Sequence, residues 1–316
     1  MLVSFGFVST ALELHDSSPA KTMTYATYSK RDSELRLQQL IAITKKNLES
    51  TLRVLHYCVA HQLPLHRMSS SIVPLATHPD VNWDYLKYTW REFAEIGALV
   101  KKYDLRTSMH PNQFTLFTSP REEVTQNAVK DLMYHYDMLS AMGIADSSYL
   151  NIHVGGAYGD KEDALRRFYE NIKTLPVTIL KRMTLENDDK TFHAEETLDV
   201  CEQLGVPMMY DFHHDQANPS IPLSEIMPRF VKTWEGTGRP PKVHLSSPKN
   251  EKQYRSHHDF VSLDYVLPFF KEAAKHTDTL DVMIEAKEKD RAALRLIAKV
   301  EKVRGFKRLS GGTILM

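Results

Sequence analysis

Short apolar runs alternate with longer amphipathic segments along this chain of 316 residues. The runs are rich in β-branched, aromatic and aliphatic residues, which is typical of strands buried on both faces. In the longer segments apolar residues recur three, four and seven positions apart, as at Leu48, Leu52 and Leu55, and this spacing predicts helices. The predicted strands are 3–8, 64–69, 105–110, 149–153, 182–186, 207–212, 242–245 and 281–285. The predicted helices are 33–61, 82–103, 120–142, 161–174, 194–204, 222–235, 258–275 and 288–303.

The strict alternation of strand and helix predicts the architecture. No break in composition divides the chain, so residues 1–316 are expected to form one α/β domain, a (β/α)8 TIM barrel. A doubly wound sheet is the alternative, but no GxGxxG or P-loop follows the first predicted strand. The polar connection 9–32 is too long for a plain βα loop and is expected to be functional or to wrap over the barrel.

Composition narrows the class of protein. The chain is 42% apolar and 25% charged, as soluble globular proteins are, and its formal net charge is zero. Any binding to a polyanion must therefore use a local patch. Cys58 and Cys201 have no CxxC spacing and are expected to be free thiols in a reducing compartment. No apolar run reaches the roughly 18 residues of a membrane span, so a cytoplasmic location is expected.

Imidazoles and carboxylates stand at the C-terminal ends of the predicted strands. Because these ends converge on one opening of a barrel, residues far apart in the sequence are expected to become neighbours there. The residues at or just past the strand ends are His110, His153, Glu186, Asp211, His214, His244 and Glu285. His78 and His257 lie in the loops after the second and the seventh strand.

This donor set predicts a metal centre. Imidazole and carboxylate ligands without cysteine suit divalent Mn, Fe or Zn, and a bridging carboxylate suits a centre of several metals. Such a centre can clamp a phosphate, supply a hydroxide and stabilise a leaving oxygen. Phosphodiester hydrolysis and sugar isomerisation both remain open on this reasoning. Asp188 and Asp189, just after Glu186, are instead expected to form a turn and cap the next helix.

Nine short segments, spread through nearly the whole chain and in a fixed order, resemble the ultraviolet damage endonucleases, most closely those of Bacillus-type bacteria. The segments are Gly6–Ser9, Ser69–Pro74, His110–Phe114, Asn151–Gly156, Leu185–Asp189, Asp211–His214, Lys242–Ser247, Ser256–His257 and Ile284–Lys287.

The resemblance implies a barrel like that of endonuclease IV and an ATP-independent DNA repair nuclease. Such an enzyme nicks damaged double-stranded DNA immediately 5′ of cyclobutane pyrimidine dimers and 6-4 photoproducts, leaving a 3′-hydroxyl and a 5′-phosphate. It implies a cluster of up to three divalent metal ions, with Mn²⁺ preferred and Zn²⁺ or Mg²⁺ as alternatives, in a protein expected to be a monomer. A sugar isomerase or epimerase of the same barrel class is the competing hypothesis, and a lesion-binding protein without catalysis is a third.

Carried over position by position, the resemblance also implies a site. Glu186 is the expected bridging ligand, and Lys242 matches a lysine that is carboxylated in this family. The implied metal ligands are His78, His110, His153, Glu186, Asp211, His214, His244, His257 and Glu285. The implied catalytic set is Glu186, Lys242, His244 and Glu285.

Further residues are implied to contact DNA. Gln113 and Phe114 match the pair that probes the lesion, where a flat apolar ring can fill the gap in the base stack. A tyrosine often stands at the second of these positions, so Phe114 would keep the stacking and lose a hydroxyl. Thr10 is nearest to an asparagine that several family members carry. Candidate phosphate contacts are Lys249 and Arg255 in the loop 247–255, with Lys21, Lys30, Arg31 and Arg67 from earlier in the chain.

Overall fold

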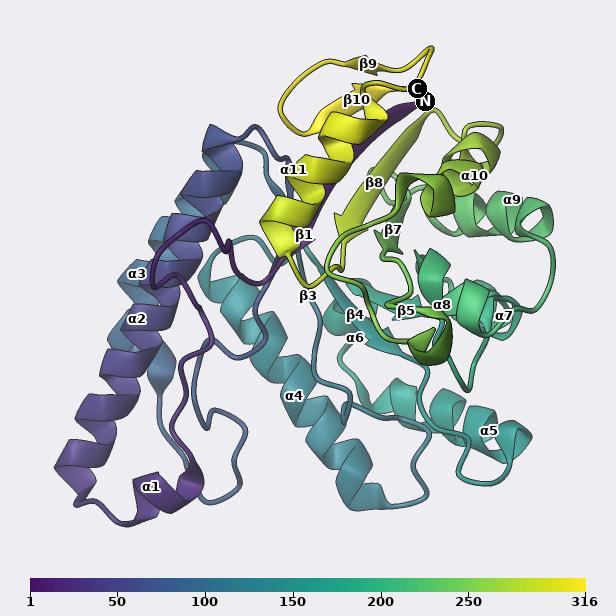
Figure 1. Ribbon diagram of the computed structural model, residues 1–316. Helices are drawn as coiled ribbons and strands as arrows, with labels where there is room; N and C mark the ends of the chain where they lie inside the picture. The colour runs from purple at the N-terminus through teal and green to yellow at the C-terminus, as the bar shows by residue number, and fades with distance from the viewer.

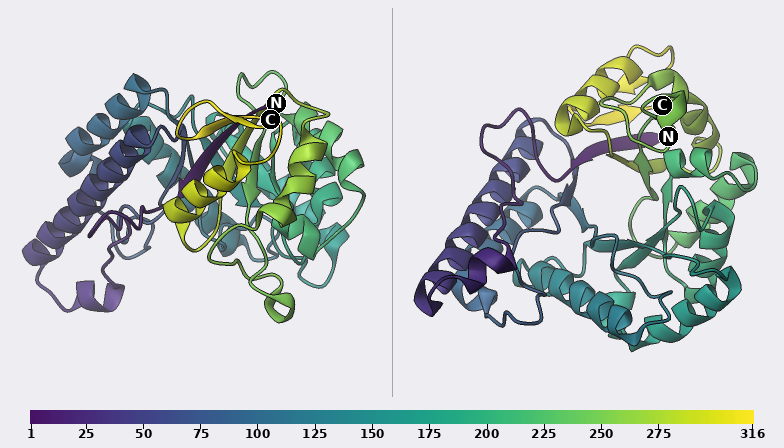
Figure 2. Two further views of the ribbon diagram at one scale, coloured as in Figure 1. Left: turned by 45° about the horizontal axis from the view of Figure 1, so that its top comes forward. Right: turned by 60° about the horizontal axis from the view of Figure 1, so that its bottom comes forward.

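The computed structural model describes residues 1–316 and confirms the predicted (β/α)8 barrel. The parallel strands follow one another around the barrel from β2 to β8, and β1 pairs with both β8 and β2 to close it. Helices surround the strands on the outside (Figure 1 and the right-hand view of Figure 2). The strands are β1 Leu2–Val8, β2 Leu65–Met68, β3 Arg106–Met109, β4 Tyr149–His153, β5 Met183–Glu186, β6 Met208–Asp211, β7 Lys242–Leu245 and β8 Thr279–Ile284.

Each predicted helix is present, and all but the helix 194–204 have shifted ends. The expected helix 258–275 begins only at Leu263, because the preceding backbone bonds to another loop: the His258 amide donates to the Ser247 carbonyl at 2.8 Å. The helices that follow the strands are α2 Ser33–Ala60, α3 Tyr85–Lys102, α4 Glu122–Ala141, α5 Lys161–Asn171, α7 Ala194–Leu204, α9 Leu223–Thr233, α10 Leu263–Ala273 and α11 Lys289–Val300.

Several short elements were not predicted. The connection 9–32 contains a helix, and the chain turns into another helix directly after β6. These elements are α1 Tyr25–Ser29, α6 Val177–Leu180, α8 Phe212–Ala217, the 3-10 turn Glu251–Gln253, and the strands β9 Lys307–Arg308 and β10 Thr313–Leu315; the last turn of the predicted helix 161–174 is the 3-10 turn Ile172–Thr174. Each is too short to produce a clear periodic signal in the sequence.

The two ends of the chain meet at the N-terminal side of the barrel. Strand β10 pairs antiparallel with β1 from Leu2 to Ser4, whereas β2 pairs with β1 only from Gly6 to Val8. The C-terminal strand therefore covers the stretch of β1 that β2 does not reach. The Met1 amino group donates to the Met316 carbonyl at 2.7 Å, and Figure 1 shows the termini side by side.

Apolar packing lies mainly between strands and helices, in one cluster of 70 buried residues. The inside of the barrel is more polar. Residues two positions apart on a strand share a face, so Lys242 and His244 lie one above the other on β7. Near the N-terminal end, Arg106 forms two hydrogen bonds with Asp281, at 2.7 and 2.8 Å. The barrel thus carries a charged layer below the layer of strand-end residues.

We expect Asp281→Asn to lower the free energy of unfolding by about 3 kcal/mol, because it leaves the Arg106 guanidinium largely buried without its carboxylate. Asp281 is 2% exposed in this pair and Arg106 19%. Urea denaturation of the purified variant measures the change. The matched control is Asp199→Asn, which removes an exposed partner of Arg229 and should cost less than about 1 kcal/mol. Equal losses in the two variants would contradict the role of the buried pair.

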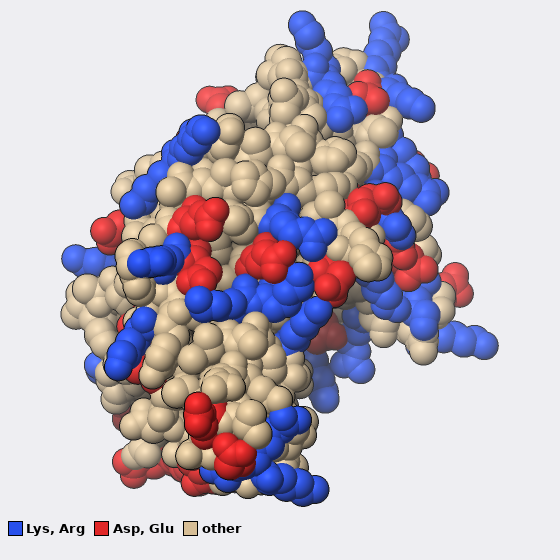
Figure 3. All heavy atoms as spheres, turned by 90° about the vertical axis from the view of Figure 1, so that its left-hand side faces the viewer, with Lys and Arg blue, Asp and Glu red and all other residues tan.

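The face of the molecule formed by α2 and α3 shows no field of one charge. On this face, lysine and arginine side chains are interspersed with aspartate and glutamate (Figure 3). This mixture agrees with the zero net charge of the chain. No helix combines the length and the apolar character that crossing a membrane requires.

Candidate active site

Side chains from the C-terminal ends of six strands, β3 to β8, or from the segments just after them, meet at the mouth of the barrel. Three groups of possible metal ligands form there, and within each group the ligand atoms lie within 4.8 Å of one another. Glu186 belongs to all three groups and is 1% exposed. The groups are His110–His153–Glu186, Glu186–His244–Glu285 and Glu186–Asp211–His214. The strand-end carboxylate at 186 is therefore the common member of the cluster.

Neighbouring side chains hold the Glu186 carboxylate in place. His244 Nδ1 lies 3.0 Å from Oε1, and His110 Nε2 lies 3.2 Å from Oε2. Asn151 Nδ2 donates to the same Oε2, and the Thr184 hydroxyl donates to Asn151 Oδ1 at 2.8 Å. Because Asn151 and Thr184 are paired inward-facing positions of β4 and β5, the register of these strands fixes the orientation of Glu186.

Three histidines are oriented by backbone carbonyls. The Nδ1 atoms of His110, His214 and His257 lie 2.8, 3.0 and 2.6 Å from the carbonyl oxygens of Pro111, Asn187 and Glu285. A carbonyl only accepts, so each Nδ1 carries a proton, and the nitrogen left to bind a metal ion is Nε2. In His110 that nitrogen faces a Glu186 oxygen. Two acceptors in contact call for a cation between them, either a proton or a metal ion.

The carboxylates and imidazoles shift one another's pKa values. Burial disfavours the charge of Glu186, but His244, His153 and His110 outweigh it and hold its pKa well below the usual range. Burial likewise opposes protonation of His214 and His244, yet nearby carboxylates raise the pKa of His214 to about 9 and that of His244 to about 10. Protonated imidazoles therefore balance the buried negative charge when no metal is present.

The donor set of the cluster fits divalent metals. Asp211 Oδ2 is buried without any hydrogen-bond partner. An unpaired buried polar atom is costly in free energy, and coordination to an ion would satisfy it. Three imidazole–carboxylate groups that share one acid match the chemistry of Mn, Fe or Zn better than that of an alkali ion. The residues present thus fit a cluster of divalent ions.

Some predicted site residues lie elsewhere. The His78 ring stacks on Tyr25, with centroids 4.1 Å apart, and belongs to none of the three groups. The Thr10 hydroxyl bonds to Ser17, 3.1 Å from its carbonyl oxygen. Burial lowers the pKa of the Lys242 ammonium to about 8, and its charged neighbours are Asp281, Arg106 and Arg239. Lys242 therefore faces the charged layer beneath the cluster.

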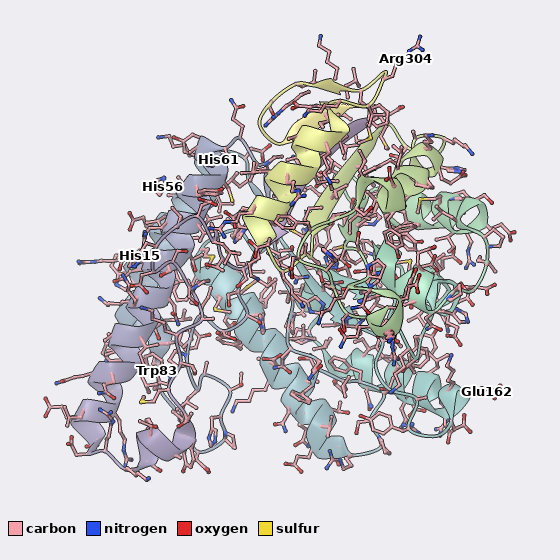
Figure 4. All side chains as sticks on the ribbon, viewed as in Figure 1. His15, His56, His61, Trp83, Glu162 and Arg304 are labelled. Carbon is pink, nitrogen blue, oxygen red and sulfur yellow. The ribbon has the colours of Figure 1, made fainter.

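Further histidines show why position matters more than number. Of the fifteen in the chain, His15, His56 and His61 are exposed and lie along α2, away from the barrel mouth (Figure 4).

Asp188 takes the role predicted for it. Its carboxylate accepts from the amides of Lys190 at 2.8 Å and Phe192 at 3.0 Å, which closes the turn after β5.

Three contributors to the site were missed or misplaced by sequence reasoning. Asn151 orients Glu186. Asn187 brackets Asp211, donating to its carbonyl and accepting from its amide, both at 2.9 Å. Arg67, expected as a contact to DNA phosphates, forms an ion pair with Glu285 inside the mouth. The alternation of side chains along β2 could have predicted that Arg67 faces the inside of the barrel, because it is two residues after the inward-facing Leu65.

A cavity of about 290 Å³ opens over the cluster. It is lined by Ser9, Arg67, Met68, Ser69, Ser70, His110, His153, Glu186, His214 and Glu285. The turn after β3 carries Gln113 and Phe114, both exposed, and residue Phe114 is 71% exposed. Such an exposed large aromatic at a turn is available to a partner.

The loop 247–258 also borders the mouth. It carries Lys249 and Arg255, both exposed, and Arg255 Nε lies 3.8 Å from Asp189 Oδ2. The Tyr254 hydroxyl lies 3.3 Å from that of Tyr265, which lies 3.1 Å from His213 Nδ1. These contacts tie the basic loop to the helix that follows Asp211.

Comparison with known proteins places the chain. A UV DNA damage endonuclease of Bacillus velezensis is 59% identical over 316 residues, with 99% of each chain covered. The crystal structure of SacUVDE superimposes with a TM-score of 0.84 at 29% identity, covering 95% of this chain and 99% of that one. An AP endonuclease, family 2, from Brucella melitensis shares the fold at 12% identity, with a TM-score of 0.50, covering 90% of this chain and 93% of that one. The family described as UV-endonuclease UvdE matches residues 3–315, and this protein belongs to that family.

Proposed function

We propose that the protein is a DNA repair endonuclease that nicks duplex DNA immediately 5′ of ultraviolet photoproducts, leaving a 3′-hydroxyl and a 5′-phosphate. Membership of the UvdE family favours phosphodiester hydrolysis over the sugar isomerisation that the donor set alone left open. The observation that carries the proposal is the sharing of Glu186 by three ligand groups at the barrel mouth. We further propose that the enzyme acts as a monomer in the cytoplasm, without ATP.

The residues at the mouth would hold up to three divalent ions, with Mn²⁺ preferred. Glu186 would bridge them, with His110, His153, Asp211, His214, His244, His257 and Glu285 as the other ligands. Ions bound there supply Lewis-acid stabilisation of the phosphate and lower the pKa of water. Asn151 and Asn187 keep Glu186 and Asp211 in fixed positions, so the ligands need little rearrangement.

Lesion recognition is assigned to the exposed turn after β3. Phe114 would stack in the space left by the displaced dinucleotide while Gln113 contacts the opposing bases. Lys249 and Arg255 would bind flanking phosphates, which gives the local patch that a chain of zero net charge needs. The Ser9 side chain, on the cavity wall, is better placed for a lesion contact than Thr10.

Lys242 would be the carboxylated lysine that the family resemblance implies. Its burial lowers the pKa of its amine to about 8, which raises the share of the neutral form that can react with carbon dioxide. The neighbouring Arg106 and Arg239 would favour the resulting anion, whereas Asp281 would oppose it.

The proposal is tested by mapping the cut. A duplex carrying one thymine dimer, labelled at the 5′ end of the damaged strand, is incubated with the protein and Mn²⁺. The expected product ends at the nucleotide just before the dimer and is extended by a DNA polymerase, which requires a 3′-hydroxyl. A cut 3′ of the dimer, or an end that the polymerase cannot extend, would contradict the proposed reaction.

Metal affinity is expected to rise with pH. In the metal-free protein the pKa values of His214 and His244, about 9 and about 10, keep both rings protonated at neutral pH. Metal binding requires the neutral rings, so it should release about two protons. The affinity for metal should therefore rise about tenfold per pH unit for each proton released. Calorimetry in buffers of different ionisation enthalpy measures the release. His244→Gln should release about one proton fewer, and binding without proton release would contradict this assignment.

A further inference from the structure

The cavity over the cluster has two chemically different walls. One wall carries the carboxylates and imidazoles already assigned to metal binding. The other is formed by Arg67, Ser9, Ser69 and Ser70, which lie at the ends of β1 and β2. Arg67 is the only lysine or arginine that lines the cavity. A cation beside serine residues is suited to an anion rather than to a metal ion.

Most of the hydrogen-bonding capacity of Arg67 is unused. Its side chain is 16% exposed, and Nη1 donates to Glu285 Oε1. A guanidinium has five N–H donors in a planar fork, and the Glu285 carboxylate is the single protein acceptor for those of Arg67. A largely buried group with several free donors needs an acceptor from outside the protein. The fork matches two oxygens of a phosphate diester.

The position of Arg67 is rigid. Its carbonyl accepts from the Ser9 amide at 2.8 Å, and Val8 pairs with it across the β1–β2 register. Glu285 Oε1, which accepts from Arg67 Nη1, also lies 3.0 Å from His244 Nδ1. Ser9 has a φ of +67°, a left-handed conformation that serine rarely adopts and that is found at functional sites more often than elsewhere. The wall is therefore built before any substrate arrives.

We propose that Arg67 binds the scissile phosphodiester, placing its free N–H groups on the non-bridging oxygens while Glu285 fixes the guanidinium. Ser9, Ser69 and Ser70 complete this phosphate subsite opposite the ligand wall. The assignment rests on the proposed endonuclease function and adds a phosphate-binding residue to it. A fixed cation at this point stabilises the charge that develops on the phosphate oxygens during hydrolysis.

The test uses Arg67→Met, which keeps the length and apolar part of the side chain. Single-turnover nicking of the thymine-dimer duplex at saturating protein should fall about a hundredfold. Metal content, measured by elemental analysis, should equal that of the unaltered protein. Arg67→Lys, which keeps the charge without the fork, should recover only part of the rate. If Arg67→Met loses metal and shows no other defect, the proposal is wrong, and Arg67 only holds Glu285 in place.

A binding experiment separates phosphate contact from general electrostatics. The probe is the dimer duplex with a neutral methylphosphonate at the diester 5′ of the lesion, titrated in Ca²⁺ alongside the ordinary duplex. The unaltered protein should bind the neutral probe about tenfold more weakly, and Arg67→Met should bind both alike. The control is Lys289→Met, which removes a charge near Glu285 but outside the cavity lining, and should keep the tenfold difference.

Two results would contradict the assignment in different ways. If the unaltered protein nicks the dimer duplex but Arg67→Met retains the tenfold penalty, the phosphate lies elsewhere and only the role of Arg67 falls. If the unaltered protein neither nicks nor prefers the dimer duplex, the proposed endonuclease function falls and the subsite falls with it.

Discussion

Glu186→Gln is expected to abolish nicking, with a loss of about 10⁴-fold or more in the single-turnover rate, while affinity for the dimer duplex stays within a few-fold. The amide has no charge and one acceptor fewer, yet Glu186 is the single acid shared by three ligand groups. Removing it would uncouple ions that together supply several kcal/mol of stabilisation. Binding should survive because the lesion contacts lie on the exposed turn after β3.

Rate, metal content and affinity are measured on the same preparation. The expected pattern is a lost rate, a reduced metal content and a retained affinity. Glu202→Gln is the matched control, because it makes the same chemical change in a surface pair with Arg229, 2.8 Å away, and should leave all three quantities unaltered. Normal nicking by Glu186→Gln would refute the bridging role.

Replacing both Gln113 and Phe114 by alanine should reduce the preference for damaged over undamaged duplex by about 10²- to 10³-fold. Stacking of one aromatic side chain on a base is worth about 1–3 kcal/mol, and the amide adds contacts to the unpaired bases. The turn is well anchored: the Phe114 amide donates to Asn112 Oδ1 at 2.8 Å, and the Thr115 hydroxyl to Asp131 Oδ2 at 2.6 Å. The substitution therefore removes side chains without releasing the loop.

Competition binding between dimer and undamaged duplexes measures this preference. Phe114→Tyr should keep it, since the ring remains. Tyr103→Ala, which removes another exposed aromatic side chain, at the end of α3, should not change it. Unaltered selectivity in the double variant would show that damage is sensed by another part of the mouth.

The barrel could be predicted because its signal is periodic and repeated. Each strand is a short apolar run, each helix has a regular apolar face, and the parallel arrangement places all C-terminal strand ends at one mouth. For this reason Glu186 and His110, 76 positions apart, could be expected to meet, as they do at 3.2 Å. Asp188 could be predicted as a turn residue, unlike Glu186, because a carboxylate just past a strand and before a helix commonly binds backbone amides.

The parts of the fold and the site that could not be predicted depend on contacts between residues far apart in the sequence, which no local pattern encodes. Strand β10 is a three-residue run whose partner is the first strand of the chain. The paired residues Leu2 and Leu315 are 313 positions apart in the sequence but adjacent in the sheet. His78 and His257 are both loop histidines in the sequence, yet only His257 donates to Glu285 beside the cluster. Loop side chains take their direction from tertiary contacts rather than from a fixed period.

The central claim is that divalent metal at the Glu186 cluster drives cutting beside the lesion. The most direct measurement strips the protein with EDTA, removes the chelator, and follows a duplex bearing a single thymine dimer after Mn²⁺ is added. We expect no cutting before Mn²⁺ is added, cutting at the diester 5′ of the dimer after it, and none in an undamaged duplex. Undiminished cutting by the stripped protein, or no cutting with any divalent metal, would contradict it.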